Sequence, residues 1–232
     1  MFSERLAGSL PRVRDQMAAA ANRVGRDPSD TRVVAVTKGH PVAVVEAALE
    51  AGLRDLAENR VEALMERVPA FRDRDCRWHM VGRLQRRKAP DVRGLVELLH
   101  SLDSLKLARR LERTSGDGDP VLGALVQVNT SGEDSKGGLT PDNAVDAVGE
   151  MLEMSSIELR GLMTMAPYTD DEALLRSTFR TLREVNDRLI SELNGYEGRE
   201  LSMGMSNDFE VAIEEGSTMV RLGTVLFGER DG

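Results

Sequence analysis

The sequence predicts an α/β protein in which strands and helices alternate eight times, the pattern of a single (β/α)8 TIM barrel. Eight short apolar segments of strand length are separated by segments with helical periodicity. No linker or change of composition divides residues 1–232, so we expect one domain. An open doubly wound sheet is the alternative, because it is built from the same βαβ units.

The first predicted element is a helix over residues 3–24, which is additional to the barrel. The first strand, 32–37, is a β-branched apolar run typical of a strand buried on both faces. The helix after it begins at Pro41 and ends at Gly52, as helix start and stop signals require. By the same criteria, strands are expected at 54–57, 77–81, 96–102, 121–129, 157–164, 200–203 and 218–222, and helices at 58–67, 85–93, 103–114, 141–151, 170–194 and 208–215.

The composition excludes several classes of protein. The net charge of -8 argues against non-specific nucleic-acid binding as the main task. A single cysteine, Cys76, rules out a disulfide framework and favours a reducing compartment, so we expect a cytoplasmic protein. No signal peptide or membrane-spanning run is present in the sequence, and no histidine or cysteine spacing suggests a metal site.

Lys38 is the first candidate functional residue, because it follows the first predicted strand directly. In a (β/α)8 barrel the carboxyl ends of the strands form the active-site face. A lysine that loses solvation there has a lowered pKa and can attack a carbonyl group. A Schiff base with a substrate or with pyridoxal 5′-phosphate (PLP) is the natural use. An ordinary surface lysine in a strand-to-helix loop is the alternative interpretation.

The loops after the seventh and eighth strands have the composition of a phosphate site. Gly204 and Ser206 follow one strand, and Gly223 and Thr224 follow the other. Barrel phosphate sites often lie in these two loops, although Ser206 as a helix cap and Gly223 as a turn glycine are the simpler interpretations. Arg221, within the eighth strand, must be paired or point into the lumen; a solvent ion pair is its alternative.

Three further features have simple interpretations. Asn59 is interpreted as a helix cap, and His79, in the middle of a strand, as a core residue. The stretch from Arg83 to Lys88 is locally basic in an acidic protein. A solvated helix face is the default for it, and an anion-attracting patch is the alternative.

Six segments carry a resemblance to a known family: VAVTKGHP, AENRVEAL, WHMVGRLQRRK, QVNTSGEDSKGGL, LRGLMTMAP and LSMGMSNDFEVAIEEGSTMVRLGTVLFGER. Together they resemble the pyridoxal-phosphate homeostasis proteins, which are related to the N-terminal barrel of alanine racemase. The resemblance implies a fold-type III PLP-binding barrel. Ala57, where the family commonly has glycine, and the arginines around Leu84-Gln85 depart from the family pattern.

The resemblance also implies a role for each residue at the cofactor. Lys38 would form the internal aldimine and Arg221 would face the pyridine nitrogen. The remaining positions are of two kinds, phosphate-binding for Ser206, Gly223 and Thr224, and cofactor-lining for Asn59, Val81 and Met203.

The function implied is a PLP carrier in vitamin B6 homeostasis that holds PLP without turnover. An arginine facing the pyridine nitrogen leaves it unprotonated and the ring a poor electron sink. Racemases of this type also use an acid/base from a further domain, which we expect to be absent here. Tyr168 could still reach the mouth, so a small amino-acid racemase is the alternative and a Schiff-base aldolase without PLP a weaker one. We expect a monomer that interacts with PLP and with PLP-dependent apoenzymes, not with nucleic acid or membranes.

Overall fold

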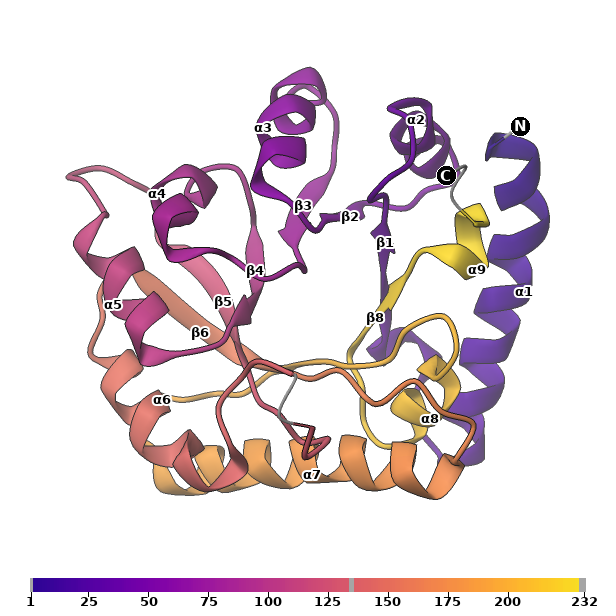
Figure 1. Cartoon of the computed structure of the whole chain (residues 1–232). Coiled ribbons are helices and arrows are strands. Elements are labelled where there is room, and N and C mark those ends of the chain that lie inside the picture. The colour runs from indigo at the N-terminus through magenta and orange to yellow at the C-terminus, as the bar shows by residue number, and fades with distance from the viewer. Residues whose placement is uncertain (1, 134–135, 230–232) are drawn as a thin grey trace.

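The eight predicted strands close into one parallel barrel in chain order (Figure 1). The computed structural model describes residues 2–133 and 136–229. The closed strand order confirms the predicted barrel, and the alternative of an open doubly wound sheet is wrong. The strands are β1 (Arg32–Val36), β2 (Asp55–Glu58), β3 (Arg77–Met80), β4 (Leu98–Leu102), β5 (Leu122–Gln127), β6 (Ile157–Met163), β7 (Glu200–Ser202) and β8 (Met219–Leu222).

Helices follow the strands as predicted, with differences at their ends. They are α1 (Phe2–Arg23), α2 (Ala43–Glu50), α3 (Val61–Ala70), α4 (Ala89–Val92), α5 (Leu105–Arg113), α6 (Ala144–Leu152), α7 (Glu172–Glu192), α8 (Phe209–Glu214) and α9 (Thr224–Phe227). The helix expected from residue 58 begins at Val61, because Glu58 pairs with Met80 as part of β2. The helix expected over 85–93 is a 3₁₀ turn followed by α4, since Pro90 is tolerated only in a first turn.

The strands separate two apolar layers. The larger one fills the space between strands and helices and includes Ala35 and Leu56. The smaller one lies inside the barrel and consists of Val34, Val36, Ala57, Leu98, Leu125, Met163 and Met219. Because successive strand residues point to opposite faces, residues in register with the smaller set point into the lumen.

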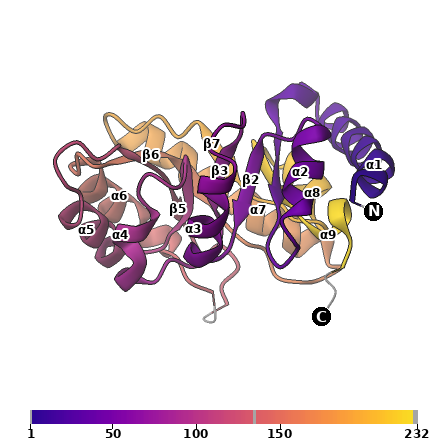
Figure 2. The ribbon, with the colours of Figure 1, turned by 90° about the horizontal axis from the view of Figure 1, so that it is seen from above.

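The additional helix α1 packs outside the barrel against α2, α8 and α9, at one edge of the molecule in Figure 2. Ser9 in α1 donates a buried hydrogen bond of 2.8 Å to the carbonyl of Leu226 in α9. The first and last helices are therefore joined. None of the helices in the described part of the chain is long and apolar enough to cross a membrane.

Candidate functional site

Lys38 lies in the turn between β1 and α2, and a buried ion pair holds that turn. Arg67 Nη1 lies 2.5 Å from Glu58 Oε1, and both residues are buried. Arg67 also donates to the carbonyls of Thr37 (3.2 Å) and His40 (2.5 Å), while Thr37 Oγ1 donates to Glu58 Oε1 (2.5 Å). The backbone is therefore fixed on both sides of Lys38.

Arg221 lies inside the barrel and is only 5% exposed. Its Nη1 donates to the carbonyl (2.7 Å) and hydroxyl (2.6 Å) oxygens of Ser202, and its Nη2 donates to the carbonyl of Thr164 (2.8 Å). The solvent ion pair considered for Arg221 is therefore wrong. Burial lowers the pKa of Arg221 to about 10, and the nearby Asp208 carboxylate opposes this shift, so the side chain is charged at neutral pH.

The guanidinium retains capacity to bind another group. A guanidinium has five N–H donors. The hydrogen bonds of Arg221 to described residues number three, so two N–H groups remain for a further acceptor. All the partners are neutral oxygens, so no carboxylate in direct contact occupies those donors.

The loops after β7 and β8 meet, as a phosphate site built from both would require. Ser206 Oγ accepts a hydrogen bond of 3.3 Å from the backbone N–H of Val225, in α9. A Cβ atom added to Gly223 would lie 3.2 Å from the carbonyl oxygen of Val36, at the end of β1. The small residue thus lets the β8 loop approach the strand that precedes Lys38.

Asp208 stabilises the loop after β7 through a hydrogen bond to its backbone. Its buried carboxylate accepts a hydrogen bond of 2.5 Å from the backbone N–H of Met205. Gly204, with a φ of +96°, allows the turn: a Cβ there would lie 2.7 Å from the Cβ of Ala212. These contacts fix the backbone of the loop that carries Ser206.

The three other predicted cofactor residues lie in different environments. Asn59 and Val81 are partly exposed at the ends of β2 and β3, and Val81 packs against the lumen layer. Met203 is fully buried in the outer layer, so its side chain faces the helices. Contact of Met203 with a ligand in the lumen would therefore come from its backbone.

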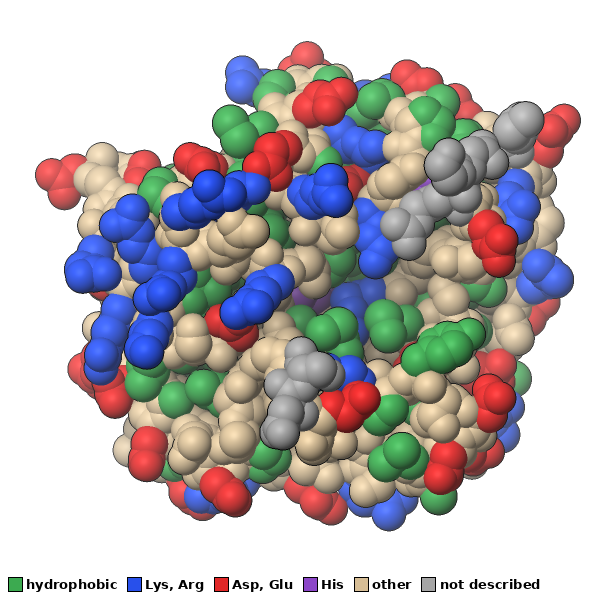
Figure 3. All heavy atoms as spheres, in the orientation of Figure 1, with side chains coloured by type: hydrophobic (Ala, Val, Ile, Leu, Met, Phe, Trp, Pro, Cys, Tyr) green, Lys and Arg blue, Asp and Glu red, His purple; other side chains and the backbone are tan. Residues whose placement is uncertain are grey.

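The site residues gather at one end of the barrel because Arg221 lies near the carboxyl end of β8 and the others follow the carboxyl ends of parallel strands. Figure 3 shows a hollow at the centre of the face it presents, with basic side chains and a histidine at its floor. Thr224 is exposed at the start of α9, beside Gly223. The sequence did not predict α9, because four residues are too few to show a helical period.

Sequence reasoning missed the residues that hold the site. Arg67, Ser202, Thr164 and Asp208 were not singled out, although each contacts a predicted residue or its loop. One signal was available for Ser202, since it is polar at an inward position of a buried strand. Nothing in the sequence indicates which partner such a residue has.

The fold and site define a class of protein: residues 9–231 match the family model of the alanine racemase N-terminal domain. A pyridoxal phosphate homeostasis protein of Aquifex aeolicus is 40% identical over 221 residues, covering 95% of this chain and 96% of the relative. A crystal structure of an unknown protein from Bifidobacterium adolescentis has a TM-score of 0.90 and 34% identity, and covers 97% of this chain and 95% of that chain.

PipY of Synechococcus elongatus, solved with PLP bound, has a TM-score of 0.82 and 31% identity. The alignment covers 98% of this chain and 100% of PipY. The chain belongs to the family of pyridoxal phosphate homeostasis proteins.

Proposed function

We propose that this protein binds PLP through the amine of Lys38 and holds it in PLP homeostasis without converting a substrate. The observation that carries the proposal is Arg221, a buried cation with N–H donors still available at the end of the barrel where Lys38 lies. The same cofactor is supported by two relatives, one named a pyridoxal phosphate homeostasis protein and one solved with PLP bound.

The residues present fit PLP at three points. Bound PLP supplies an aldehyde that condenses with a lysine amine and a pyridine ring that can accept electrons. Lys38 provides the amine, and an N–H of Arg221 suits an unprotonated pyridine nitrogen, which is an acceptor. Ser206, Gly223 and Thr224 are proposed to hold the phosphate from the two loops that meet near α9.

Two arguments favour holding PLP over turning a substrate over, one from the proposed contact of Arg221 with PLP and one from the two tyrosines. An N–H of Arg221 placed at the pyridine nitrogen would keep that nitrogen unprotonated and would weaken the ring as an electron sink. Tyr196 is buried outside the lumen, its hydroxyl donates to Asn186 Oδ1 (2.8 Å), and burial raises its pKa. Tyr168 is 93% exposed, so neither tyrosine is packed against the lumen layer.

The cellular context stays a prediction. We propose a cytoplasmic monomer of 25.5 kDa that passes PLP to apoenzymes which use it. Light scattering would test whether the protein is a monomer. For transfer, a PLP-free apoenzyme would be mixed directly with the PLP-loaded protein or separated from it by a membrane that only PLP can cross. Faster recovery of the apoenzyme's activity on direct mixing would show transfer by contact.

The first experiment is PLP titration of the wild-type protein beside Lys38→Ala and Lys38→Arg. We expect a visible absorption band in the wild type only, abolished by borohydride reduction, with the added mass on the peptide containing Lys38. Lys38→Arg keeps the charge but forms no imine. The same band in either variant would reject Lys38 as the attachment point.

A second measurement separates the alternatives. If the protein removes the optical activity of a chiral amino acid at a rate typical of an enzyme, it is a racemase and not a pure carrier. Borohydride trapping that requires a carbonyl substrate in a colourless protein would establish the aldolase.

A further inference from the structure

A continuous chain of buried hydrogen bonds crosses the barrel lumen and ends on Arg221. We name Asp55, His79, His100 and Ser202 the lumen relay. Asp55 Oδ1 lies 3.0 Å from His79 Nε2, His79 Nδ1 lies 2.9 Å from His100 Nε2, and His100 Nδ1 lies 2.8 Å from Ser202 Oγ. Ser202 Oγ then accepts from Arg221 Nη1 at 2.6 Å. Each member is at most 5% exposed.

Only one direction of donation uses every hydrogen in the relay. Ser202 Oγ accepts from Arg221, so its own hydrogen must go elsewhere, and among the described residues His100 Nδ1 is the remaining partner. His100 then carries its hydrogen on Nε2 and donates to His79 Nδ1, which leaves His79 Nε2–H to donate to Asp55. Both imidazoles are neutral in this arrangement.

The electrostatics of the two ends agree with this direction. Burial, together with the charge of Arg221, lowers the pKa of His100 well below its ordinary value. Burial raises the pKa of Asp55, but hydrogen bonds from Arg77 and His79 outweigh it and hold that pKa well below its usual range. The relay therefore runs from a buried cation to a carboxylate through neutral groups.

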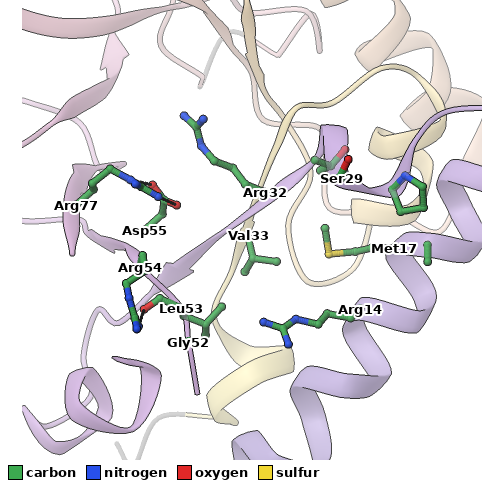
Figure 4. Close-up of a pocket in the computed structure, with 13 residues that line it drawn as sticks. Arg14, Met17, Ser29, Arg32, Val33, Gly52, Leu53, Arg54, Asp55 and Arg77 are labelled. Atoms are coloured by element: carbon green, nitrogen blue, oxygen red, sulfur yellow. Dashed lines mark hydrogen bonds and ion pairs between the residues drawn. The ribbon is translucent and has the colours of Figure 1, made fainter. Parts of the chain in front are cut away.

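The carboxylate end opens at the opposite end of the barrel from Lys38. Asp55 is the first residue of β2 and accepts two hydrogen bonds from Arg77, of 2.9 and 2.8 Å. Figure 4 shows this pair at the edge of a hollow of ≈ 460 Å³ that Arg14, Arg32 and Arg54 also line. Arg32 and Arg54 pair with Glu200 and Asp75, so we interpret the hollow as the solvent-facing end of the relay and not as an anion site.

We propose that the lumen relay is a positioning device that holds Arg221 charged and oriented toward PLP, without placing a carboxylate against it. A buried cation is costly unless hydrogen-bonded. A carboxylate in contact would stabilise Arg221 but would compete for the N–H groups that a pyridine nitrogen needs. A polarised chain of neutral groups ending on Asp55 stabilises the cation and leaves those donors available. The role in PLP orientation rests on the proposed function.

The hydrogen bonds can be tested without PLP. The protein contains three histidines, so ¹⁵N-histidine labelling gives a small set of ring signals. In the PLP-free protein we expect His79 and His100 both as neutral Nε2–H tautomers, with ring N–H protons protected from exchange by burial. A cationic His79, or His100 with its hydrogen on Nδ1, would overturn the proposed direction.

The positioning role needs a variant that breaks the relay and a matched one that does not. His100→Phe and Leu98→Ala both alter the lumen from β4, but only His100 belongs to the relay. We expect His100→Phe to weaken PLP binding about tenfold, because both hydrogen bonds of His100 are lost and the Ser202 hydroxyl that contacts Arg221 is no longer linked to His79. Leu98→Ala should leave the Kd for PLP within about twofold of wild type while lowering thermal stability through a cavity.

Ser202→Ala is the smaller lesion if His100→Phe does not fold. It removes the hydroxyl that joins His100 to Arg221 and keeps the carbonyl contact. We again expect weaker PLP binding, with the tautomers of the two histidines no longer fixed. If the affinity for PLP falls in proportion to thermal stability, and does so to the same extent in the relay variants and in Leu98→Ala, the positioning role is overturned. A wild-type protein that binds no PLP would reject the proposed function, and the NMR result would still decide the hydrogen bonds.

Discussion

Two buried arginines determine what the mouth of the barrel can hold, and their partners differ in kind. Arg67 is paired with a carboxylate, that of Glu58, and fixes the backbone around Lys38. Arg221 is bonded to neutral oxygens and keeps donors available. A buried charge costs several kcal/mol unless its partners satisfy it. The first arrangement is suited to holding a turn, and the second to receiving a ligand.

We expect Arg67→Met to lower the free energy of unfolding by about 3–5 kcal/mol, because it leaves Glu58 buried without its partner. PLP binding should weaken as well, since the turn that carries Lys38 loses its contacts to Thr37 and His40. Urea unfolding and PLP titration measure the two effects.

The control adds Glu58→Gln to Arg67→Met. The neutral pair removes the uncompensated charge, and Gln can still accept the hydrogen bond from Thr37. Much of the stability should return while PLP affinity stays low. Recovery of both together would mean that Arg67 acts on stability alone.

At the scale of elements, the ends of neighbouring strands must approach closely for the site to form. Gly82, directly after β3, packs against the backbone of Asn59, directly after β2. A Cβ at Gly82 would lie 2.2 Å from the carbonyl oxygen of Asn59, and a backbone atom cannot move aside as a side chain can. The two strand ends are therefore coupled through this glycine.

We expect Gly82→Ala to destabilise the protein by about 1–3 kcal/mol through overpacking and to weaken PLP binding by displacing Asn59. Gly8→Ala in α1 is the matched substitution, because no atom lies within 4 Å of its added Cβ. It should stabilise the helix by up to about 1 kcal/mol and leave PLP binding unchanged. Thermal midpoints and PLP titration distinguish the two, and an unchanged Kd in Gly82→Ala would count against a role for the Asn59 loop.

At the scale of the whole molecule, closure of the barrel joins the two ends of the sequence. β1 pairs with β8 from Arg32 opposite Met219 to Ala35 opposite Leu222. Outside this seam, α1 packs against α8 and α9. Disruption of either end therefore exposes the same core, which favours cooperative unfolding.

We expect a single unfolding transition. Trp78, the one tryptophan, is buried in the outer layer and reports local unfolding by fluorescence, while far-UV circular dichroism reports all helices. The two transitions should coincide, and free PLP at a hundredfold excess over its Kd should stabilise the fold by about 2.7 kcal/mol. An earlier loss of helix signal would show that α1 unfolds by itself and would contradict the single domain.

The sequence by itself determined the order of elements, the closed barrel as the leading fold, the extra first helix, and Lys38 and the β7 and β8 loops as candidates at one end. These are readable because strand and helix periods are local, and parallel strands place their carboxyl ends together. The roles of Asn59, Val81 and Met203 came from family resemblance alone. Their contacts with PLP, like those of the other predicted site residues, stay predictions.

Only the tertiary structure decided the partners of the buried polar groups. His100 and Ser202 are 102 residues apart, and Arg221 reaches Thr164 across 57 residues. The sequence shows that such residues are polar at inward positions, but closure of the barrel selects which of them meet. The reason is physical: local propensity fixes the direction in which a strand side chain points, whereas a hydrogen bond depends on the distance between strands that pair only when the chain has folded.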